Sequence, residues 1–258
     1  MTGIDSILYN DNIQGKGVAF DLDGTLLSGD LGETVFYLTI LMQGLGMASS
    51  DFPALVSTVK TSTEFYCPEN ADLPKVMGQY TTLIRQGQLQ QAYSLTAEYL
   101  AHFKKEEVCA FSEAVLSQEI PCQQLRLTLG AETFALTLQA KTDPLLTSII
   151  QYCYQQGARV LIISGSPQAI VEGYCLFQNL PTGIARGIQW DEKHRCVIPY
   201  GKAKLDILRQ EGITQPYIAF GNATGDLEML SAAVYPFVRK TSQQSILDQA
   251  AANHWNII

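Results

Sequence analysis

The seven residues FDLDGTL, at positions 20–26, constrain the fold of this 258-residue chain more than any other segment. They include the end of the apolar run Val18-Ala19-Phe20, which Gly17 precedes and Gly24 closely follows. Such a run is too short for a helix and is typical of a buried strand in a parallel sheet. Asp21 and Asp23 then stand at the carboxyl end of that strand, where open α/β sheets bind their ligands. The alternative is an ordinary turn, because Asp and Gly are common where strands end.

The spacing of the two aspartates carries a chemical implication. Side chains two residues apart in an extended segment point the same way, so the carboxyl groups of Asp21 and Asp23 can address one small site. Two carboxylates held that close repel each other, unless a cation neutralises one or a proton sits on the other. The pattern therefore suits an enzyme that needs one ionised nucleophile and one acid.

Composition and charge narrow the class of protein. Apolar residues make up 47% of the chain, which is enough for a sizeable core, and the length fits one core domain with an insertion. The net charge of −8 argues against a nucleic acid partner, which requires a basic surface. No apolar run approaches the length of a transmembrane helix, and no basic segment followed by an apolar stretch marks a signal peptide. We therefore expect no membrane partner.

The six cysteines bear on the compartment. They are scattered, with no CxxC pair and no histidine cluster, so neither a zinc site nor a disulfide framework is indicated. A reduced, cytoplasmic location fits this pattern best. Export by a route without a cleaved leader would leave no trace in the sequence and stays open.

Hydrophobic periodicity divides the chain into two units. Residues 1–27 and 141–258 alternate strands with helices, which predicts a Rossmann-like parallel sheet covered by helices on both faces. Residues 28–140 instead predict amphipathic helices over 32–45, 73–85, 89–103 and 106–116. Apolar residues alternate with polar ones over 124–139, which indicates a small β-hairpin, with a helix as the alternative. We therefore predict an α/β core domain with an inserted, mostly α-helical cap domain.

The pattern after residue 140 predicts the elements of the second part of the core. Strands are expected at 159–163, 217–220 and 236–238, and helices at 143–154, 167–177, 203–209, 226–233 and from 245 onward. Residues 190–195 have the composition of a hairpin tip.

Polar motifs follow at later strand ends and at one helix start. Ser164 and Gly165 end an apolar strand before a helix, where a hydroxyl and backbone N–H groups form an anion cradle; a helix cap is the alternative. Lys202 and Lys204 begin a helix, where the dipole disfavours cations, so a buried phosphate would explain one of them; each is otherwise an ordinary surface lysine. Asn222 and Asp226 offer oxygen ligands that suit Mg²⁺, with a turn plus N-cap as the alternative.

Taken in order along the whole chain, these motifs resemble those of the haloacid dehalogenase-like (HAD) superfamily of phosphohydrolases. The resemblance implies that Asp21 is the nucleophile that forms an aspartyl-phosphate and that Asp23 is the general acid and base. Phosphate binding would fall to Ser164, Gly165 and either Lys204 or Lys202. Leu205 and Leu208 follow Lys204 with the family's spacing, which favours Lys204. Mg²⁺ would be held by Asp21, the Asp23 backbone carbonyl, Asn222 and Asp226.

One residue supports a phosphatase, and another departs from the family pattern. The family's pumps and dehalogenases generally lack an acid two residues after the nucleophile, so Asp23 favours a phosphatase. The family usually has Asp where this chain has Asn222. An amide ligates Mg²⁺ through one oxygen and lowers the negative charge of the site, which weakens metal binding but also reduces repulsion of phosphate.

The insertion directly after the first motif, and the C-terminal segment, resemble the phosphoserine and phosphorylcholine phosphatase branch. In that branch a cap carboxylate contacts the cationic group of the substrate, a role that falls here to Glu33 with Asp30 nearby; two acids stabilising a helix start are the alternative. We predict a Mg²⁺-dependent phosphomonoester hydrolase acting on a small organic phosphate such as phosphoserine or phosphocholine. The alternatives are a phosphoprotein phosphatase, which the few basic residues of the cap disfavour, and a catalytically weak HAD-fold binding protein.

Overall fold

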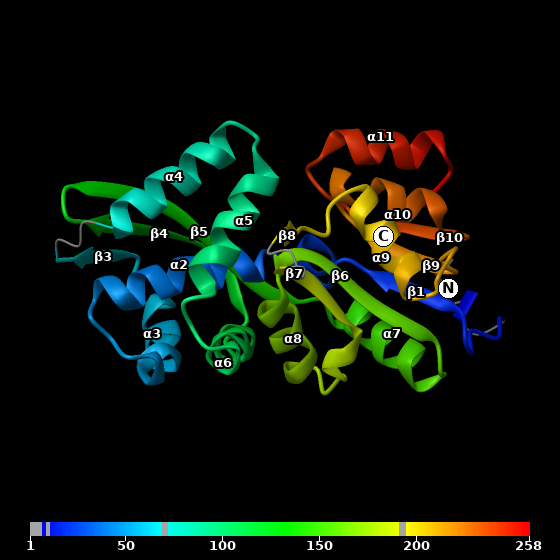
Figure 1. The fold of residues 1–258 in the computed structure, drawn as a ribbon, viewed down its shortest axis with the longest axis horizontal. Helices are drawn as coiled ribbons and strands as arrows, with labels where there is room; N and C mark the ends of the chain where they lie inside the picture. Colours follow the sequence, from blue (N-terminus) through cyan, green and yellow to red (C-terminus); the bar gives the residue numbers. More distant parts are fainter. Residues whose placement is uncertain (1–6, 9–10, 69–71, 191–194) are drawn as a thin grey trace.

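The computed structural model describes residues 7–8, 11–68, 72–190 and 195–258. Within this part of the chain the larger sheet has seven strands in the order β11-β10-β9-β1-β6-β7-β8 (Figure 1). Its strands are β1 (Gly17–Phe20), β6 (Arg159–Pro167), β7 (Ala185–Trp190), β8 (Cys196–Val197), β9 (Ile218–Gly221), β10 (Tyr235–Val238) and β11 (Asn256–Ile257). Neighbouring strands are parallel except β7 and β8, which are antiparallel.

Helices cover both faces of this sheet, because successive residues of a strand point to opposite sides. Val18 and Phe20 of β1 belong to the core shared with α7 (Pro144–Gln155) and α8 (Gln168–Phe177). Ala19 between them belongs to the core shared with α9 (Lys202–Gln210), α10 (Leu227–Ala232) and α11 (Gln244–Ala252), and Figure 1 shows the two groups of helices on opposite sides of the sheet. A run that is apolar at every position is what a strand buried on both faces requires.

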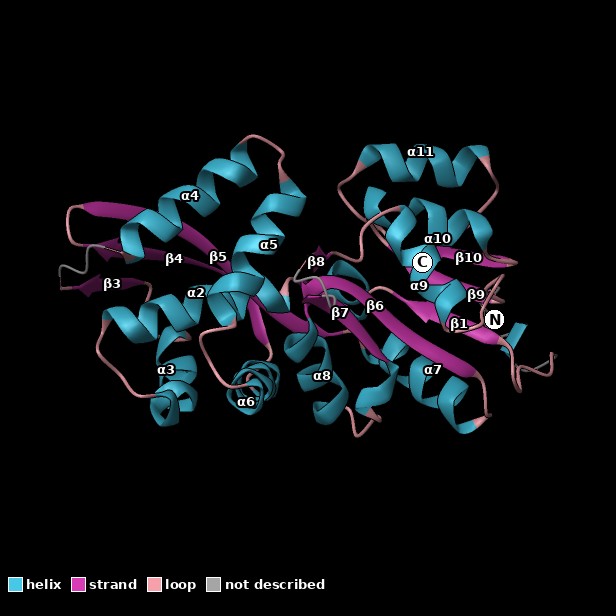
Figure 2. Cartoon of the chain, viewed as in Figure 1, coloured by secondary structure: helices cyan, strands magenta, loops and turns pink. Residues whose placement is uncertain are grey.

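The segment between β1 and α7 forms a second unit, the cap (Figure 2). Its sheet has the order β2-β5-β4-β3. The strands are β2 (Leu27–Gly29), β3 (Glu64–Cys67), β4 (Ile120–Leu129) and β5 (Glu132–Thr142), and the helices are α2 (Leu31–Gly44), α3 (Phe52–Val59), α4 (Leu73–Arg85), α5 (Leu89–Leu100) and α6 (Lys105–Ser117). Helix α2 is buried along nearly its whole length because it contacts β5, α3, α5 and α6.

Most predicted elements are confirmed, and several are longer than expected. The four predicted cap helices correspond to α2, α4, α5 and α6, and the hairpin at 124–139 is β4 and β5, which turn at Gly130 with a φ of 58°. The short elements α3, β2 and β3 were not predicted, and β2 and β3 extend the hairpin into a four-stranded sheet. In the core, β6 runs on to Pro167, so Ser164 and Gly165 belong to the strand. Residues 191–194 of the predicted hairpin tip lie outside the described residues.

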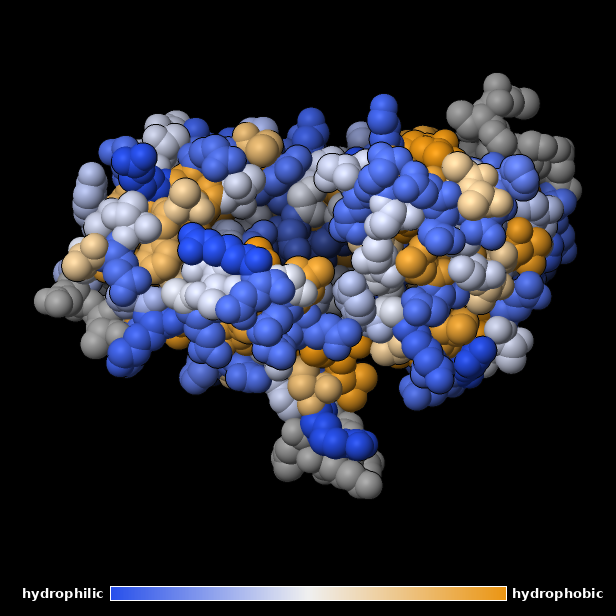
Figure 3. Space-filling model, turned by 90° about the horizontal axis from the view of Figure 1, so that it is seen from above, coloured by the Kyte–Doolittle hydropathy of each residue, from blue (hydrophilic) through white to orange (hydrophobic). Residues whose placement is uncertain are grey.

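The cap and the core meet around a hollow. Figure 3 shows this hollow between the two lobes, with hydrophilic side chains at its base. Helices α5 and α6 bring the cap against the core, through contacts of α5 with β6 and β7 and of α6 with α8. None of the described helices is long and apolar enough to cross a membrane.

Candidate active site

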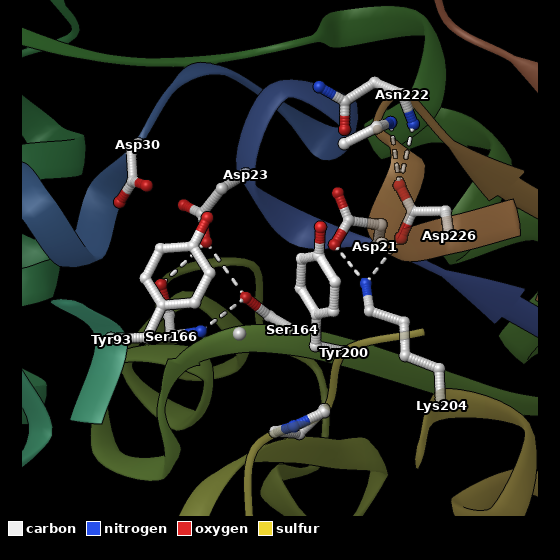
Figure 4. Close-up of a pocket in the computed structure, with 14 residues that line it drawn as sticks. Asp21, Asp23, Asp30, Tyr93, Ser164, Ser166, Tyr200, Lys204, Asn222 and Asp226 are labelled. Carbon is white, nitrogen blue, oxygen red and sulfur yellow. Dashed lines mark hydrogen bonds and ion pairs between the residues drawn. The ribbon is translucent and has the colours of Figure 1, made fainter. Parts of the chain in front are cut away.

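The carboxyl ends of β1, β6 and β9 and the start of α9 meet at one cavity of about 70 Å³ (Figure 4). They converge because β1 lies between β6 and β9 and all three strands are parallel. Its lining residues are Asp21, Asp23, Asp30, Tyr93, Ser164, Gly165, Ser166, Pro199, Tyr200, Lys204, Asn222, Ala223, Gly225 and Asp226. Eight of the ten residues predicted for the site are among them; Lys202 and Glu33 are not.

The turn after β1 fixes how the two aspartates point. Asp21 and Asp23 both have extended backbone angles, whereas Gly24 has a φ of 74° that a residue with a side chain rarely adopts. A Cβ on Gly24 would also lie 2.0 Å from the side-chain amide of Asn222. The glycine therefore lets the chain reverse tightly beside the loop after β9. Thr25, the next residue, donates a hydrogen bond of 3.0 Å to Asp21 Oδ2.

Asp21 and Lys204 form a buried ion pair. The Lys204 ammonium donates to Asp21 Oδ1 and to Asp226 Oδ1, both at 2.6 Å. Lys204 is only 3% exposed, so its charge can be kept inside the protein only with such partners. Lys202 lies two residues away on α9 and is exposed. The structure thus separates the two lysines, and Lys202 does not take part in the cavity.

Burial and the neighbouring charges both shift the pKa values of this pair. Burial and the neighbouring charge of Asp226 raise the pKa of Asp21 to about 7, against the opposing effect of Lys204. Burial lowers the pKa of Lys204, but Asp21 and Asp226 outweigh it and hold that pKa above its usual range. Lys204 therefore stays charged, while the ionisation of Asp21 depends on how much positive charge surrounds it.

Asp23 has a different set of partners. The hydroxyls of Ser164 and Ser166 donate to its Oδ2 at 2.9 and 2.7 Å, and the Leu31 backbone N–H donates to its Oδ1 at 2.8 Å. Burial raises the pKa of Asp23, and these hydrogen bonds oppose the rise only in part. A carboxyl group whose neutral form is favoured by burial is suited to donate a proton.

The side-chain amide of Asn222 lies among three oxygen atoms of the residues that follow β1. One terminal atom of its amide lies 3.1 Å from each of Thr25 Oγ1, the Asp23 carbonyl oxygen and Asp21 Oδ2. If this atom is the amide nitrogen, it donates hydrogen bonds to these oxygen atoms. If it is the amide oxygen, it lies close to the Asp23 carbonyl oxygen and Asp21 Oδ2, and a cation between the three would relieve their repulsion. Ligand oxygens on adjacent corners of a Mg²⁺ octahedron lie about 2.9 Å apart. Asp21, the Asp23 carbonyl and Asn222 therefore fit Mg²⁺, through one carboxylate, one carbonyl and one amide.

Asp226 contacts both the buried lysine and the loop after β9. Its Oδ1 accepts from Lys204, and its Oδ2 accepts from the backbone N–H groups of Asn222 and Ala223 at 2.9 and 3.0 Å. Both oxygens are thus engaged in fixing the lysine and the loop that carries Asn222. In the described part of the chain, no three His, Cys, Asp or Glu side chains are grouped to hold a metal, so a cation here would also need the Asp23 carbonyl and the Asn222 amide.

Of the two cap acids, Asp30 lines the cavity and Glu33 does not. Asp30 is the N-cap of α2 and accepts from the Glu33 backbone N–H at 2.7 Å. Burial, followed by the charges of Asp23 and Glu33, raises the pKa of Asp30 well above its usual range. The Glu33 side chain instead accepts hydrogen bonds from the hydroxyls of Tyr37 and Tyr80, at 2.5 and 2.8 Å. In this structure the Glu33 side chain therefore joins α2 to α4.

Four residues that line or support the cavity with a hydroxyl group were not predicted: Thr25, Tyr93, Ser166 and Tyr200. Ser166 had a signal, since it lies two residues beyond Ser164 in an extended segment and so points the same way. Thr25 directly follows Asp23 and Gly24, so its place next to the two aspartates in the sequence could have indicated it. Tyr93 and Tyr200 had none, because only the packing of α5 and of the loop before α9 brings them to the cavity.

Comparisons with known proteins bear on the fold alone. No protein-family model matches the sequence. A search of curated proteins likewise gives no match.

Solved structures, in contrast, match nearly the whole chain. A protein with unknown function from Bordetella pertussis Tohama I matches with a TM-score of 0.61 and 15% identity, over 95% of this chain and 98% of that one. A functionally unknown protein from Anaerococcus prevotii DSM 20548 matches with a TM-score of 0.59 and 13% identity, over 96% and 86%. A HAD family hydrolase from Salmonella enterica serovar Typhi matches with a TM-score of 0.51 and 14% identity, over 95% and 68%. The chain therefore has the predicted HAD-like fold.

Proposed function

We propose that this chain, with its HAD-like fold, is a Mg²⁺-dependent phosphomonoester hydrolase. The observation that carries the proposal is the different surroundings of two neighbouring carboxyl groups. Asp21 is paired with a buried ammonium, whereas Asp23 is bound only by neutral donors. One carboxyl group is thus held next to positive charge, as a nucleophile needs to be, and the other is kept as an acid.

The residues divide the reaction between them. Asp21 attacks phosphorus with its carboxylate and forms an aspartyl-phosphate, while Asp23 gives its proton to the leaving oxygen. Asp23 then takes a proton from the water that hydrolyses the aspartyl-phosphate. Lys204, together with Ser164 and the backbone of Gly165 in the cavity wall, neutralises and orients the phosphoryl group. Mg²⁺, when bound by Asp21, the Asp23 carbonyl and Asn222, supplies further positive charge for the dianionic phosphate.

The substrate that fits best is a small phosphate ester with a cationic group. A cavity of about 70 Å³ is well below the roughly 300–1,000 Å³ of pockets that bury a drug-sized ligand. Asp30 lies in its wall, where burial and the neighbouring acids favour its neutral form. A bound amine or quaternary ammonium, as in phosphoserine or phosphocholine, would favour the ionised form and pair with it. The same small volume disfavours a phosphoprotein, since a folded chain would have to displace the cap.

A screen of phosphate esters tests this proposal. Phosphoserine, phosphocholine, neutral alkyl and aryl phosphates and a phosphopeptide are incubated with the protein, with Mg²⁺ or with a chelator. We expect Mg²⁺-dependent phosphate release from the small esters, which Asp21→Asn abolishes. Tight phosphate binding without any turnover would instead support a HAD-fold binding protein, and preferential release from the phosphopeptide would support a protein phosphatase.

A further inference from the structure

Tyr93 is the residue through which a cap helix reaches the cavity. It lies on α5, which packs against β6 and β7 of the core. Among the lining residues, only Tyr93 comes from a helix of the cap, since Asp30 precedes α2. Figure 4 shows its ring in front of Asp23 and Ser166, with its hydroxyl directed toward the acids.

The position of the Tyr93 ring depends on a glycine in the core. A Cβ on Gly165 would lie 3.3 Å from both Cδ2 and Cε2 of Tyr93. Such a contact is tighter than a well-packed pair of carbon atoms accepts, so a larger residue would push the ring away. The ring therefore rests on the backbone of β6, directly beside Ser164 and Ser166, which hold Asp23.

The surroundings of the Tyr93 hydroxyl place it on the leaving-group side. Burial, followed by the charges of Asp30, Asp23 and Asp21 in that order, raises the pKa of Tyr93. The hydroxyl is thus neutral, and Figure 4 shows it directed toward the proposed acid, Asp23. Among the described residues, none forms a hydrogen bond with it, so its position is set by the ring.

We propose that Tyr93 is a specificity-determining residue, whose ring, resting on Gly165, limits the size of the leaving group that the closed site accepts. This inference rests on the proposed function. A leaving group bound to phosphorus extends from Asp21 past Asp23, and the Tyr93 ring stands in that direction. Leaving groups bulkier than those of phosphoserine and phosphocholine meet the ring unless the cap moves.

The test compares two esters that differ in size but have leaving alcohols of similar acidity, ethyl phosphate and 2-phenylethyl phosphate. We expect Tyr93→Ala to raise the ratio of kcat/KM for the large ester to that for the small one by about 10-fold or more, which corresponds to roughly 1.36 kcal/mol. Tyr93→Phe retains the ring and should leave the ratio within about twofold of the parent. Tyr99→Ala is the matched control, because Tyr99 lies on the same helix, contacts Phe36 and is absent from the cavity wall.

Gly165→Ala provides the second measurement. It should change the ratio in the parent, where it displaces the ring, and should have no effect on the ratio in the Tyr93→Ala background. Equal effects of Gly165→Ala in both backgrounds, or an unchanged ratio in an active Tyr93→Ala enzyme, would overturn the inference alone. A folded parent that hydrolyses neither ester, nor any other phosphate, would contradict the proposed function and this inference with it.

Discussion

Lys204 Nζ lies 2.6 Å from Asp21 Oδ1, although the two residues are 183 positions apart in the chain. Both side chains are buried, and the second carboxylate on the lysine, Asp226, is buried as well. Two carboxylates and one ammonium leave a net negative charge in a small, dry volume. A divalent cation beside Asp21 would relieve this excess. Without one, burial and the charge of Asp226 raise the pKa of Asp21.

Replacing Lys204 with Met should cost at least about 100-fold in kcat/KM, the loss of roughly 2.7 kcal/mol of transition-state stabilisation. Among the described residues of the cavity wall, Lys204 supplies the only cation, whereas Met fills similar space without charge. Lys202→Met is the matched control, since Lys202 is exposed on the same helix, and it should retain parental activity. Equal losses of kcat/KM in the two variants, measured on a small alkyl phosphate, would contradict the assignment of Lys204 to phosphate binding.

Asp23→Asn should impair alkyl phosphates more than aryl phosphates. Alkoxide leaving groups need protonation and phenolates need less, so the ratio of the two kcat/KM values should change by at least about tenfold, or 1.36 kcal/mol. The amide oxygen can still accept from both serine hydroxyls, while the hydrogen bond from the Leu31 N–H is lost. Steady-state kinetics on one ester of each kind measures the ratio. An equal loss of kcat/KM for the alkyl and the aryl ester would contradict the acid role of Asp23.

The metal-free protein should lose stability as the pH rises from about 4 to 7. The folded pKa of Asp21 is about 7, above its ordinary value of 3.8, so between these values the folded state binds more protons than the unfolded state. Stability then falls with pH by at most about 1.4 kcal/mol per pH unit from this group. Urea unfolding in chelator at several pH values measures the slope. Asp21→Asn should flatten it, and an equal slope in parent and variant would contradict the assignment.

Asp30→Asn and Glu33→Gln should separate substrate recognition from cap structure. Asp30→Asn should lower kcat/KM for a cationic phosphate by about 10–100-fold, equivalent to roughly 1.4–2.7 kcal/mol, with little change for a neutral aryl phosphate. Glu33→Gln should leave this selectivity unchanged and lower the free energy of unfolding, because it weakens the hydrogen bonds from Tyr37 and Tyr80. If Glu33→Gln changed the selectivity and Asp30→Asn did not, Glu33 would be the residue that contacts the substrate.

The parts of the site that are local in sequence could be predicted from it. Asp21, Asp23 and Ser164 follow apolar runs that are recognisable as buried strands, and parallel strands bring their carboxyl ends to one edge. The choice between Asp30 and Glu33 could not be predicted, because it depends on the direction of each side chain. Asp30 has extended backbone angles as an N-cap, whereas Glu33 lies one turn into the helix and meets Tyr37 on the same helix face.

Long-range packing determined what could not be predicted. Tyr93 is one of several apolar or aromatic residues on α5, and nothing in its helix distinguishes it from Tyr99. Strand β3 was missed because it is a four-residue edge strand, which is too short to show a clear alternation of buried and exposed side chains. Its pairing with β4 is a contact between residues about 60 positions apart.

The central claim is that Asp21 carries the phosphoryl group. The direct measurement is to quench the enzyme during turnover with borohydride, which reduces an acyl phosphate to an alcohol, and to examine the peptide containing residue 21 by mass spectrometry. The account predicts homoserine at position 21 when substrate and Mg²⁺ are present, and unmodified Asp21 when substrate is omitted. Reduction at another residue of an active enzyme, or full turnover by the Asp21→Asn variant, would contradict it.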